Sequence, residues 1–249
     1  TISITGVTTG FRFNNTGSKL NIRTITNWGT LRLGNSNGYF YGCSNLTLTT
    51  VAGTLDLTGT TDLYQIFGSC GSLTTVYGIK SWDTSAVTSM YHMFYSCSNF
   101  NQALSFNTAA VTNMTGMFQF CSSFNSSLTF NTALVNTMNF MFFLASQFNT
   151  APTFSSTAAV TNMQSMFRDC SSFNKALSFN TAAVTNMTQM FEGATAFDQN
   201  IGSWNVANVT SFTSFMVTKT PATFSTTNLD AIYNGWSASG VKPNINISF

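Results

Sequence analysis

Residues 111–118, Val-Thr-Asn-Met-Thr-Gly-Met-Phe, return almost unchanged as residues 184–191, Val-Thr-Asn-Met-Thr-Gln-Met-Phe. The Met-Phe pair itself recurs at Met93, Met117, Met141, Met166 and Met190, and then inverted as Phe215-Met216. The successive steps are 24, 24, 25, 24 and 25 residues. A fixed period in this range predicts a solenoid, in which one supersecondary unit is stacked on copies of itself.

Each repeat carries a fixed set of apolar columns around its Met-Phe pair: a Val, a second Met, a Cys or Ala, and a Phe followed by Asn or Asp. Two weaker copies upstream keep the aromatic residue and the cysteine. We therefore count eight turns, centred on Phe40, Phe67, Phe94, Phe118, Phe142, Phe167, Phe191 and Met216. One unit cannot offset the roughly 1.5 kcal/mol that ordering each residue costs, so stability must come from stacking.

The repeat predicts an α/β solenoid of turns 24–27 residues long. Val-Thr-Asn-Met is typical of a short strand, and the Leu-x-Phe stretch after the Phe-Asn pair predicts a second short strand or an extended segment. The four-residue spacing from Met117 to Cys121 predicts one or two helical turns between them. The recurring Asn predicts a ladder of side-chain amides that bond backbone groups at a bend.

Three segments follow from the extent of the period. Residues 1–37 break it, and the alternation at residues 1–8 and 19–28 predicts an N-terminal β cap. Residues 38–220 form the repeat array. Residues 221–249 are a C-terminal cap, in which Leu229, Ile232, Tyr233 and Trp236 have helical spacing, with Asn228 as a possible N-cap and Gly235 near the helix end.

Composition limits the partners. Only 6% of the residues are charged, against about 25% in an average soluble protein, so the surface must be rich in Ser, Thr, Asn and Gly. Such a surface is typical of extracellular and virion proteins. The net charge of +2 argues against binding nucleic acid, and no apolar run is long enough to insert into a membrane.

Few residues could perform chemistry. All five cysteines occupy one column that Ala145 and Ala194 share, which indicates free thiols in a small buried slot. The single histidine, His92, and the seven carboxylates are scattered along the repeat, and Arg168-Asp169 is typical of a surface pair. We therefore expect no catalytic residue, no metal site and no cofactor, and the chain is predicted not to be an enzyme.

Several stretches resemble the BspA-like leucine-rich-repeat surface proteins. The resemblance rests on residues 82–90, 111–118 and 194–204, with 228–236 similar to the family's closing segment, and it covers roughly residues 38–236. It implies a leucine-rich-repeat-like right-handed stack. It also implies display on a bacterial surface or a phage virion, where members are taken to bind other proteins or cell surfaces.

A candidate binding patch lies at the positions that vary while the apolar columns stay fixed. Three successive turns place apolar residues where later turns are polar: Tyr91, Tyr95, Phe120, Phe140, Phe143 and Leu144. If these positions face outward, they form an apolar patch that contacts a partner chain, either a like subunit or the particle that carries the protein. Alternatively, these residues pack under the neighbouring turn and belong to the core.

The column Thr88, Thr112, Thr161, Thr185 and Thr210 raises a remote alternative, a threonine ladder that matches ice or a crystalline polysaccharide. Most such ladders only stabilise sheets. The sequence thus predicts a non-enzymatic extracellular protein for adhesion or binding, most simply a phage virion fibre or decoration protein. Its partner would be a protein, a cell-surface glycan or a second copy of the chain. The close alternative is a bacterial cell-surface adhesin.

Overall fold

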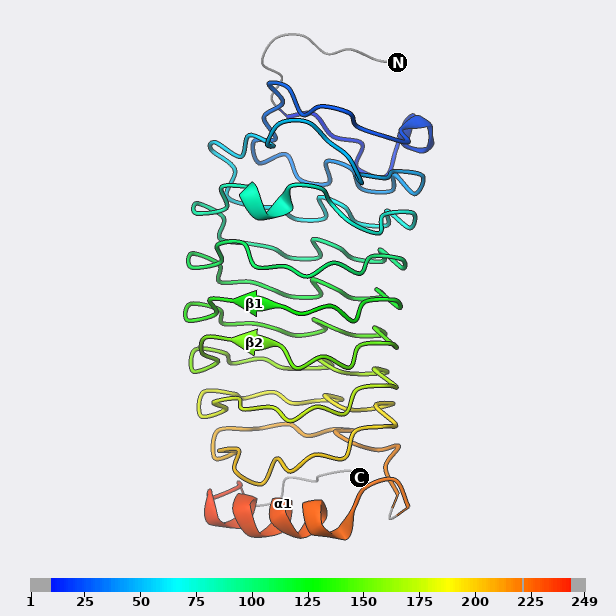
Figure 1. Cartoon of the computed structure of the whole chain (residues 1–249). Coiled ribbons are helices and arrows are strands. Elements are labelled where there is room, and N and C mark those ends of the chain that lie inside the picture. Colours follow the sequence, from blue (N-terminus) through cyan, green and yellow to red (C-terminus); the bar gives the residue numbers. More distant parts are fainter. Residues whose placement is uncertain (1–9, 221, 243–249) are drawn as a thin grey trace.

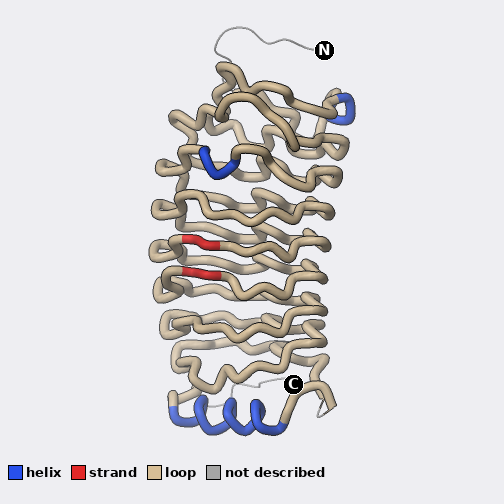
Figure 2. Tube along the Cα trace, in the orientation of Figure 1, coloured by secondary structure: helices blue, strands red, loops and turns tan. Residues whose placement is uncertain are grey.

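The chain is a stack of coils, each lying on the next, with a helix across one end (Figure 1). The computed structural model describes residues 10–220 and 222–242. Within them are two 3-10 helices, η1 (Lys19–Asn21) and η2 (Ile79–Ser81), two strands, β1 (Thr129–Phe130) and β2 (Thr153–Phe154), and one α-helix, α1 (Thr226–Ala238). Most of the remaining chain is turn and extended backbone (Figure 2).

Neighbouring coils pair in parallel at fixed columns. β1 pairs with β2, and the other contacts are single parallel bridges. The longest row of bridges follows the third position of the Val-Thr-Asn-Met motif and joins Asp62, Ser89, Asn113, Thr137, Asn162, Asn186 and Ser211 in turn. Successive coils are therefore joined backbone to backbone at the same position of each repeat.

The prediction of helical turns around the Met-Phe pair was wrong. These segments are successive β-turns: the N–H of Met93 donates to the carbonyl of Met90 (3.2 Å), and His92 between them has φ 55°. The alternate N–H groups donate to the next coil, as Met90 does to Asn113 and His92 to Thr115 (both 2.9 Å). An N–H committed to the next coil cannot bond the carbonyl four residues back, so no α-helix forms.

The core is a set of side-chain stacks that run along the coils. The central Phe of each coil from Phe40 to Phe167 lies 5.4–5.8 Å, centroid to centroid, from the corresponding Phe of the next coil, as Phe142 does from Phe167. A second stack begins with Phe100, whose ring lies 4.1 Å from that of Phe94. The Val, Met and Cys columns are fully buried. Each coil thus buries both of its faces against its neighbours, as stacking requires.

The predicted asparagine ladder is confirmed. The side-chain oxygen of Asn125 accepts the N–H of Asn149 (2.8 Å), and the oxygen of Asn149 accepts the N–H of Asn174 (3.0 Å). The ladder starts one rung earlier at Asn101 and ends at Asp198. The repeated Asn therefore supplies a side-chain acceptor for one backbone N–H of the following coil at this bend.

At the N-terminal end, the expected β cap is only partly described. Residues 1–8 lie outside the described residues, and part of the second expected strand is the 3-10 helix η1. Parallel bridges still join Thr24 to Thr47 and Asn27 to Ala52, and the N–H of Phe13 donates to the carbonyl of Tyr39 (2.8 Å). The backbone ladder thus crosses the predicted boundary at residue 37.

At the other end, a helix is present where the spacing predicted one, but its limits differ. Ser225, not Asn228, is the N-cap, and the helix continues past Gly235 to Ala238. Ile232 and Trp236 are buried, whereas Tyr233 is exposed. Ser225 takes the capping position because its N–H and hydroxyl both donate to Asp198 (3.0 Å each), the last rung of the ladder.

Candidate functional site

All six residues of the predicted patch lie on the outer side of the Met-Phe turns and are partly buried. They are neither the freely exposed surface nor the closed core that the two interpretations expected. The rings form one continuous contact chain. Tyr95 meets Phe120 edge-on at 5.4 Å, Phe120 lies 5.3 Å from Phe143, and Phe143 lies 6.1 Å from Phe140.

The contact chain extends beyond the predicted residues. The ring of Tyr91 stacks on that of Tyr64 at 5.0 Å, and His92 bridges Tyr91 and Tyr95 at 4.0 and 4.7 Å. We use the name aromatic stripe for Tyr64, Tyr91, His92, Tyr95, Phe120, Phe140 and Phe143. Sequence reasoning missed Tyr64, although the 27-residue spacing of the upstream turns places it in the column of Tyr91.

The coil backbone sets how these side chains project. Phe120, Phe140 and Leu144 have φ of 63°, 59° and 60°, a region that bulky residues rarely adopt. The same two columns hold polar residues at similar φ in later coils, for example Ser165 and Asp169. The positive φ therefore belongs to the turn in every coil. The patch results from which side chains occupy the columns.

His92 is enclosed by the stripe. Burial lowers its pKa, against a smaller raising effect from Gln119, whose side-chain oxygen lies 3.0 Å from Nε2. Its other ring nitrogen has no hydrogen-bond partner. At neutral pH a neutral imidazole suits this position, because the surrounding rings offer no counter-ion. We interpret His92 as a member of the stripe and not as a general base.

A small ionic cluster closes one end of the stripe. The guanidinium of Arg168 lies 5.3 Å from the ring centre of Phe143, a cation–π contact. The same guanidinium lies 3.4 Å from carboxylate oxygens of Asp169 and Glu192. The expected Arg168-Asp169 surface pair is therefore a three-residue cluster. At this end, the aromatic side chains of the stripe are followed by charged side chains.

The cysteine column is buried, as its exchange with alanine predicted. The thiols of Cys97, Cys121 and Cys170 donate to carbonyls one coil back, at 2.8–2.9 Å. Burial raises the pKa of Cys97 to about 12, so the thiolate is not populated at neutral pH. In the described part of the chain, no group of three or more His, Cys, Asp or Glu side chains is placed to hold a metal ion.

The threonine column uses its hydroxyls within the stack. Those of Thr112 and Thr185 donate to the carbonyls of Thr88 and Thr161, both at 3.2 Å. A second threonine column, which sequence reasoning missed, is buried and donates to the following coil, as Thr108 does to Asn131 (2.9 Å). Both columns therefore stabilise the coil-to-coil contact. No helix among the described residues is long and apolar enough to cross a membrane.

Comparison with known proteins places the chain in a family. A family model described as "Mycoplasma protein of unknown function, DUF285" matches three times, over residues 10–128, 61–153 and 151–242. The chain belongs to this family. The overlapping matches follow from its internal repetition, because one model fits several registers of a repeated sequence. No curated protein and no solved structure matches the chain.

Proposed function

We propose that this chain is a non-enzymatic, surface-displayed repeat protein that binds a partner through the aromatic stripe. The observation that carries the proposal is the stripe itself: seven rings in continuous contact, partly exposed, on a molecule with 6% charged residues. Aromatic residues are enriched at interface hot spots, because they bury large areas at low entropic cost. The resemblance to BspA-like proteins supports the same role and a right-handed leucine-rich-repeat-like solenoid.

The proposal needs no catalytic group. The thiols are held protonated by burial, and His92 is enclosed among aromatic rings. The stripe ends at Arg168, Asp169 and Glu192, whose charges orient a partner more than they add affinity. A protein partner, including a second copy of the chain, fits this combination of apolar length and charged end. A cell-surface glycan is the alternative ligand.

The stripe is tested by the double substitution Phe140→Ser and Phe143→Ser. We expect binding of the purified chain to its source cells or particles, or its self-association in light scattering, to fall at least tenfold. The matched control is Tyr77→Ser with Leu134→Ser, which removes two apolar side chains that are 57% and 56% exposed outside the stripe. Equal binding by both variants, with unchanged melting temperatures, would show that the stripe is not the interface.

The proposal includes two places of display, the surface of a phage virion and the surface of a bacterial cell. The uncharged Ser/Thr/Asn surface suits a fibre or decoration protein of a virion, and the family description, which names a bacterial genus, favours a cell-surface adhesin. Immunogold electron microscopy of the source material separates them. Label on particle heads or fibres supports the virion, and label on cell envelopes supports the adhesin. Label confined to the cell interior would contradict display.

The remote proposal of an ice- or polysaccharide-binding face is supported only by the regularity of the threonine column. Its hydroxyl hydrogens are already donated to backbone carbonyls, which leaves acceptor lone pairs alone for a ligand. A thermal-hysteresis measurement decides it for ice, and absence of activity at millimolar protein removes it.

A further inference from the structure

The coils stack in a straight column (Figure 1), and one backbone row runs along the edge that carries the aromatic stripe. In this row, one N–H of each coil donates to a carbonyl of the next coil, at 2.6–2.9 Å. Its donors are Gly42, Ser69, Ser96, Phe120, Leu144 and Asp169. In the middle of the row successive coils rotate little, since the rings of Phe94 and Phe142 are inclined to that of Phe118 by only 5° and 6°. The edge is therefore a straight surface of constant direction.

A cation lies at the N-terminal end of this edge. A Cβ on Gly42 would lie 2.9 Å from Cδ of Lys19, so the Lys19 side chain covers the first position of the row. Its ammonium donates to the carbonyl of Asn15 (2.8 Å), and among the described residues it forms no ion pair with a carboxylate. Tyr41 continues the aromatic surface toward this end, because a Cβ on Gly68 in the next coil would lie 3.0 Å from its ring.

Negative charge is in excess at the other end. Asp169, the last donor of the row, and Glu192 share the guanidinium of Arg168, each at 3.4 Å. Two carboxylates against one guanidinium leave one negative charge uncompensated, and the Asp169 side chain is 37% exposed. Asp62 borders the edge nearer the first end, where its side chain accepts the N–H of Tyr64 (2.9 Å). The turn positions of the stripe in the intervening coils hold only uncharged side chains, so the edge runs from a cation through an aromatic surface to an anion.

We propose that this edge pairs with the same edge of a second copy of the chain, antiparallel, about a two-fold axis. The proposal rests on the proposed function, in which the aromatic stripe is the binding surface. An axis at the level of Ser96 and Phe120 places Lys19 of each copy opposite Asp169 of the other. A two-fold contact is self-complementary, so this charge pair forms twice. A parallel arrangement would place like charges opposite each other, which opposes association.

The size of the edge sets the strength of the dimer. The row takes five coil steps from Gly42 to Asp169, which is about 24 Å at about 4.8 Å per step. A strip of this length that is one turn wide buries less than the about 800 Å² per partner of a standard interface. The net charge of +2 adds little general repulsion between copies. We therefore expect a reversible dimer with a Kd in the micromolar range.

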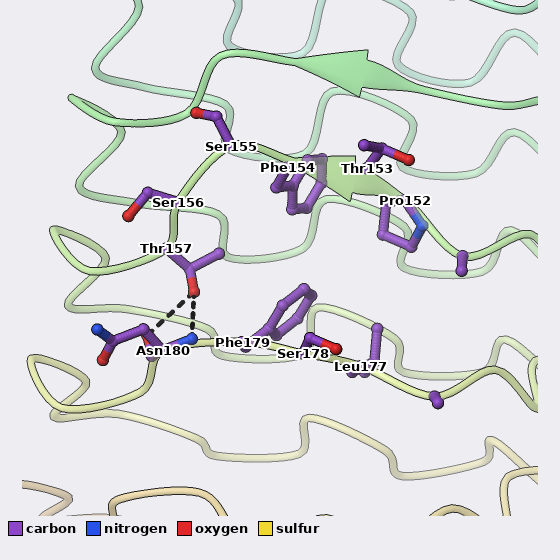
Figure 3. A pocket seen from close by; sticks show the side chains of 12 residues that line it. Pro152, Thr153, Phe154, Ser155, Ser156, Thr157, Leu177, Ser178, Phe179 and Asn180 are labelled. Atoms are coloured by element: carbon purple, nitrogen blue, oxygen red, sulfur yellow. Dashed lines mark hydrogen bonds between the residues drawn. The ribbon is translucent and has the colours of Figure 1, made fainter.

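A surface groove at other columns of the repeat lacks this order of charges. Residues 151–157 and 176–180 line a groove of about 450 Å³ (Figure 3). Its lining holds no charged side chain. The rings of Phe154 and Phe179 stack there at 6.0 Å, close to the 5.9 Å between Phe173 and Phe197 in the core. The groove therefore has no charged ends that could fix the orientation of a second copy.

Sedimentation velocity of the whole chain, from about 1 to about 200 μM, tests the charge pairing. We expect a monomer–dimer equilibrium whose Kd rises at least tenfold in Lys19→Glu, because each Glu then faces the carboxylates of the other copy. The control is Lys80→Glu, which makes the same charge change at an exposed position of η2 and should leave the Kd unchanged. Adding Asp169→Lys to Lys19→Glu reverses both partners and should restore the Kd to within threefold. Equal melting temperatures establish that the variants fold.

Cross-linking with a short bismaleimide tests the orientation. The introduced thiol in Ser96→Cys lies near the proposed axis and should link two copies. The one in Gln189→Cys lies near the anionic end and should not, because an antiparallel partner presents its other end there. The native thiols stay unmodified, since they are buried and burial raises the pKa of Cys97 to about 12. In a parallel dimer both variants would link.

Several outcomes would overturn the dimer. They are a wild-type chain that stays monomeric at the highest concentration, equal dimerisation of Lys19→Glu and Lys80→Glu, no recovery in the charge-reversed double variant, and cross-linking of Gln189→Cys. The proposed function fails by a different result, which is unchanged binding to the source cells or particles when Phe140 and Phe143 are both replaced by Ser. A monomeric chain that loses this binding in the Phe140 and Phe143 variant would keep the stripe as a binding surface and assign it to a different partner.

Discussion

At the scale of single residues, the positive-φ positions that recur in every coil explain why the Met-Phe segments form turns and not helices. Each coil holds positive φ at two columns of the Met-Phe turn, filled by residues as different as His92, Phe120 and Gln189. A non-glycine residue there costs of order 1–3 kcal/mol, which the surrounding contacts must offset. The next coil offsets it, because each such residue donates its N–H there, as His92 does to Thr115.

Gly116 leaves no room for a side chain, because the ring of His92 packs directly against it. Gly116 has φ 56°, and a Cβ there would lie 2.3 Å from the His92 ring. We expect Gly116→Ala to lower the unfolding free energy by about 1–3 kcal/mol, because it adds overpacking to an unfavourable φ. The control is Gly71→Ala, whose Cβ would meet only Ser98 at an ordinary 3.7 Å. Urea denaturation of both variants measures the difference, and equal losses would contradict this account.

At the scale of elements, the asparagine ladder and α1 form one continuous structure. Asp198 takes the place of the Asn and accepts from Ser225 and from Nδ2 of Asn228 (2.8 Å). Burial by itself would raise the pKa of Asp198, but the Ser225 N–H, the Asn228 and Ser225 side chains and the charge of Lys219 together lower it. A carboxylate is thus placed at the N-terminus of α1, where it also complements the helix dipole.

The sign of the pH dependence follows from that lowered pKa. A carboxyl group with a folded pKa below its usual value of about 3.9 stabilises the fold fully above that value. This stabilisation is lost as the pH falls through the lower, folded pKa. We expect the wild type to be more stable than Asp198→Asn at pH 7, and the difference to vanish in strong acid. Chemical denaturation between pH 7 and pH 2 checks it, and a constant difference would sink the assignment.

The packing of α1 against the last coil depends on the close approach of Gly235 to Gly202. A Cβ on Gly235 would lie 1.9 Å from the Gly202 carbonyl oxygen. In an isolated helix, Gly→Ala raises the stability of the helix by about 1 kcal/mol. Helix propensity and packing therefore predict opposite effects of Gly235→Ala on the stability of this protein. We expect Gly235→Ala to destabilise and to speed amide exchange in α1, whereas Ser237→Ala on the exposed side should not. Stabilisation by Gly235→Ala would mean that the helix is free to move away.

At the scale of the whole molecule, stability is a chain of nearest-neighbour contacts. Phe142 touches rings in its own coil and in both neighbours, at 4.2, 5.8 and 5.4 Å. Such a stack behaves as a sum of repeat and interface terms. A substitution that removes core packing in a central coil should therefore weaken the coupling between the two halves of the stack, whereas a substitution of an exposed side chain should not.

Phe142→Ala tests this coupling. Truncation of a buried Phe costs about 3–5 kcal/mol, and we expect hydrogen exchange in urea to show the two halves unfolding in separate transitions. Leu134→Ala, at a side chain that is 56% exposed, should leave a single transition at the wild-type midpoint. A single, uniformly shifted transition for Phe142→Ala would show that the coils unfold as one unit despite the lesion.

The sequence by itself determined the period, the apolar columns, the buried cysteine slot and the asparagine ladder. These can be read because a stack repeats one environment, so a column such as Cys97 and Cys121 shows its burial through the residues that replace it. Tertiary structure decided the rest. The spacing from Met117 to Cys121 fits a helix and a pair of β-turns equally well, and only the N–H groups committed to the next coil select the turns. The same holds for the aromatic stripe, whose partial exposure depends on neighbouring coils.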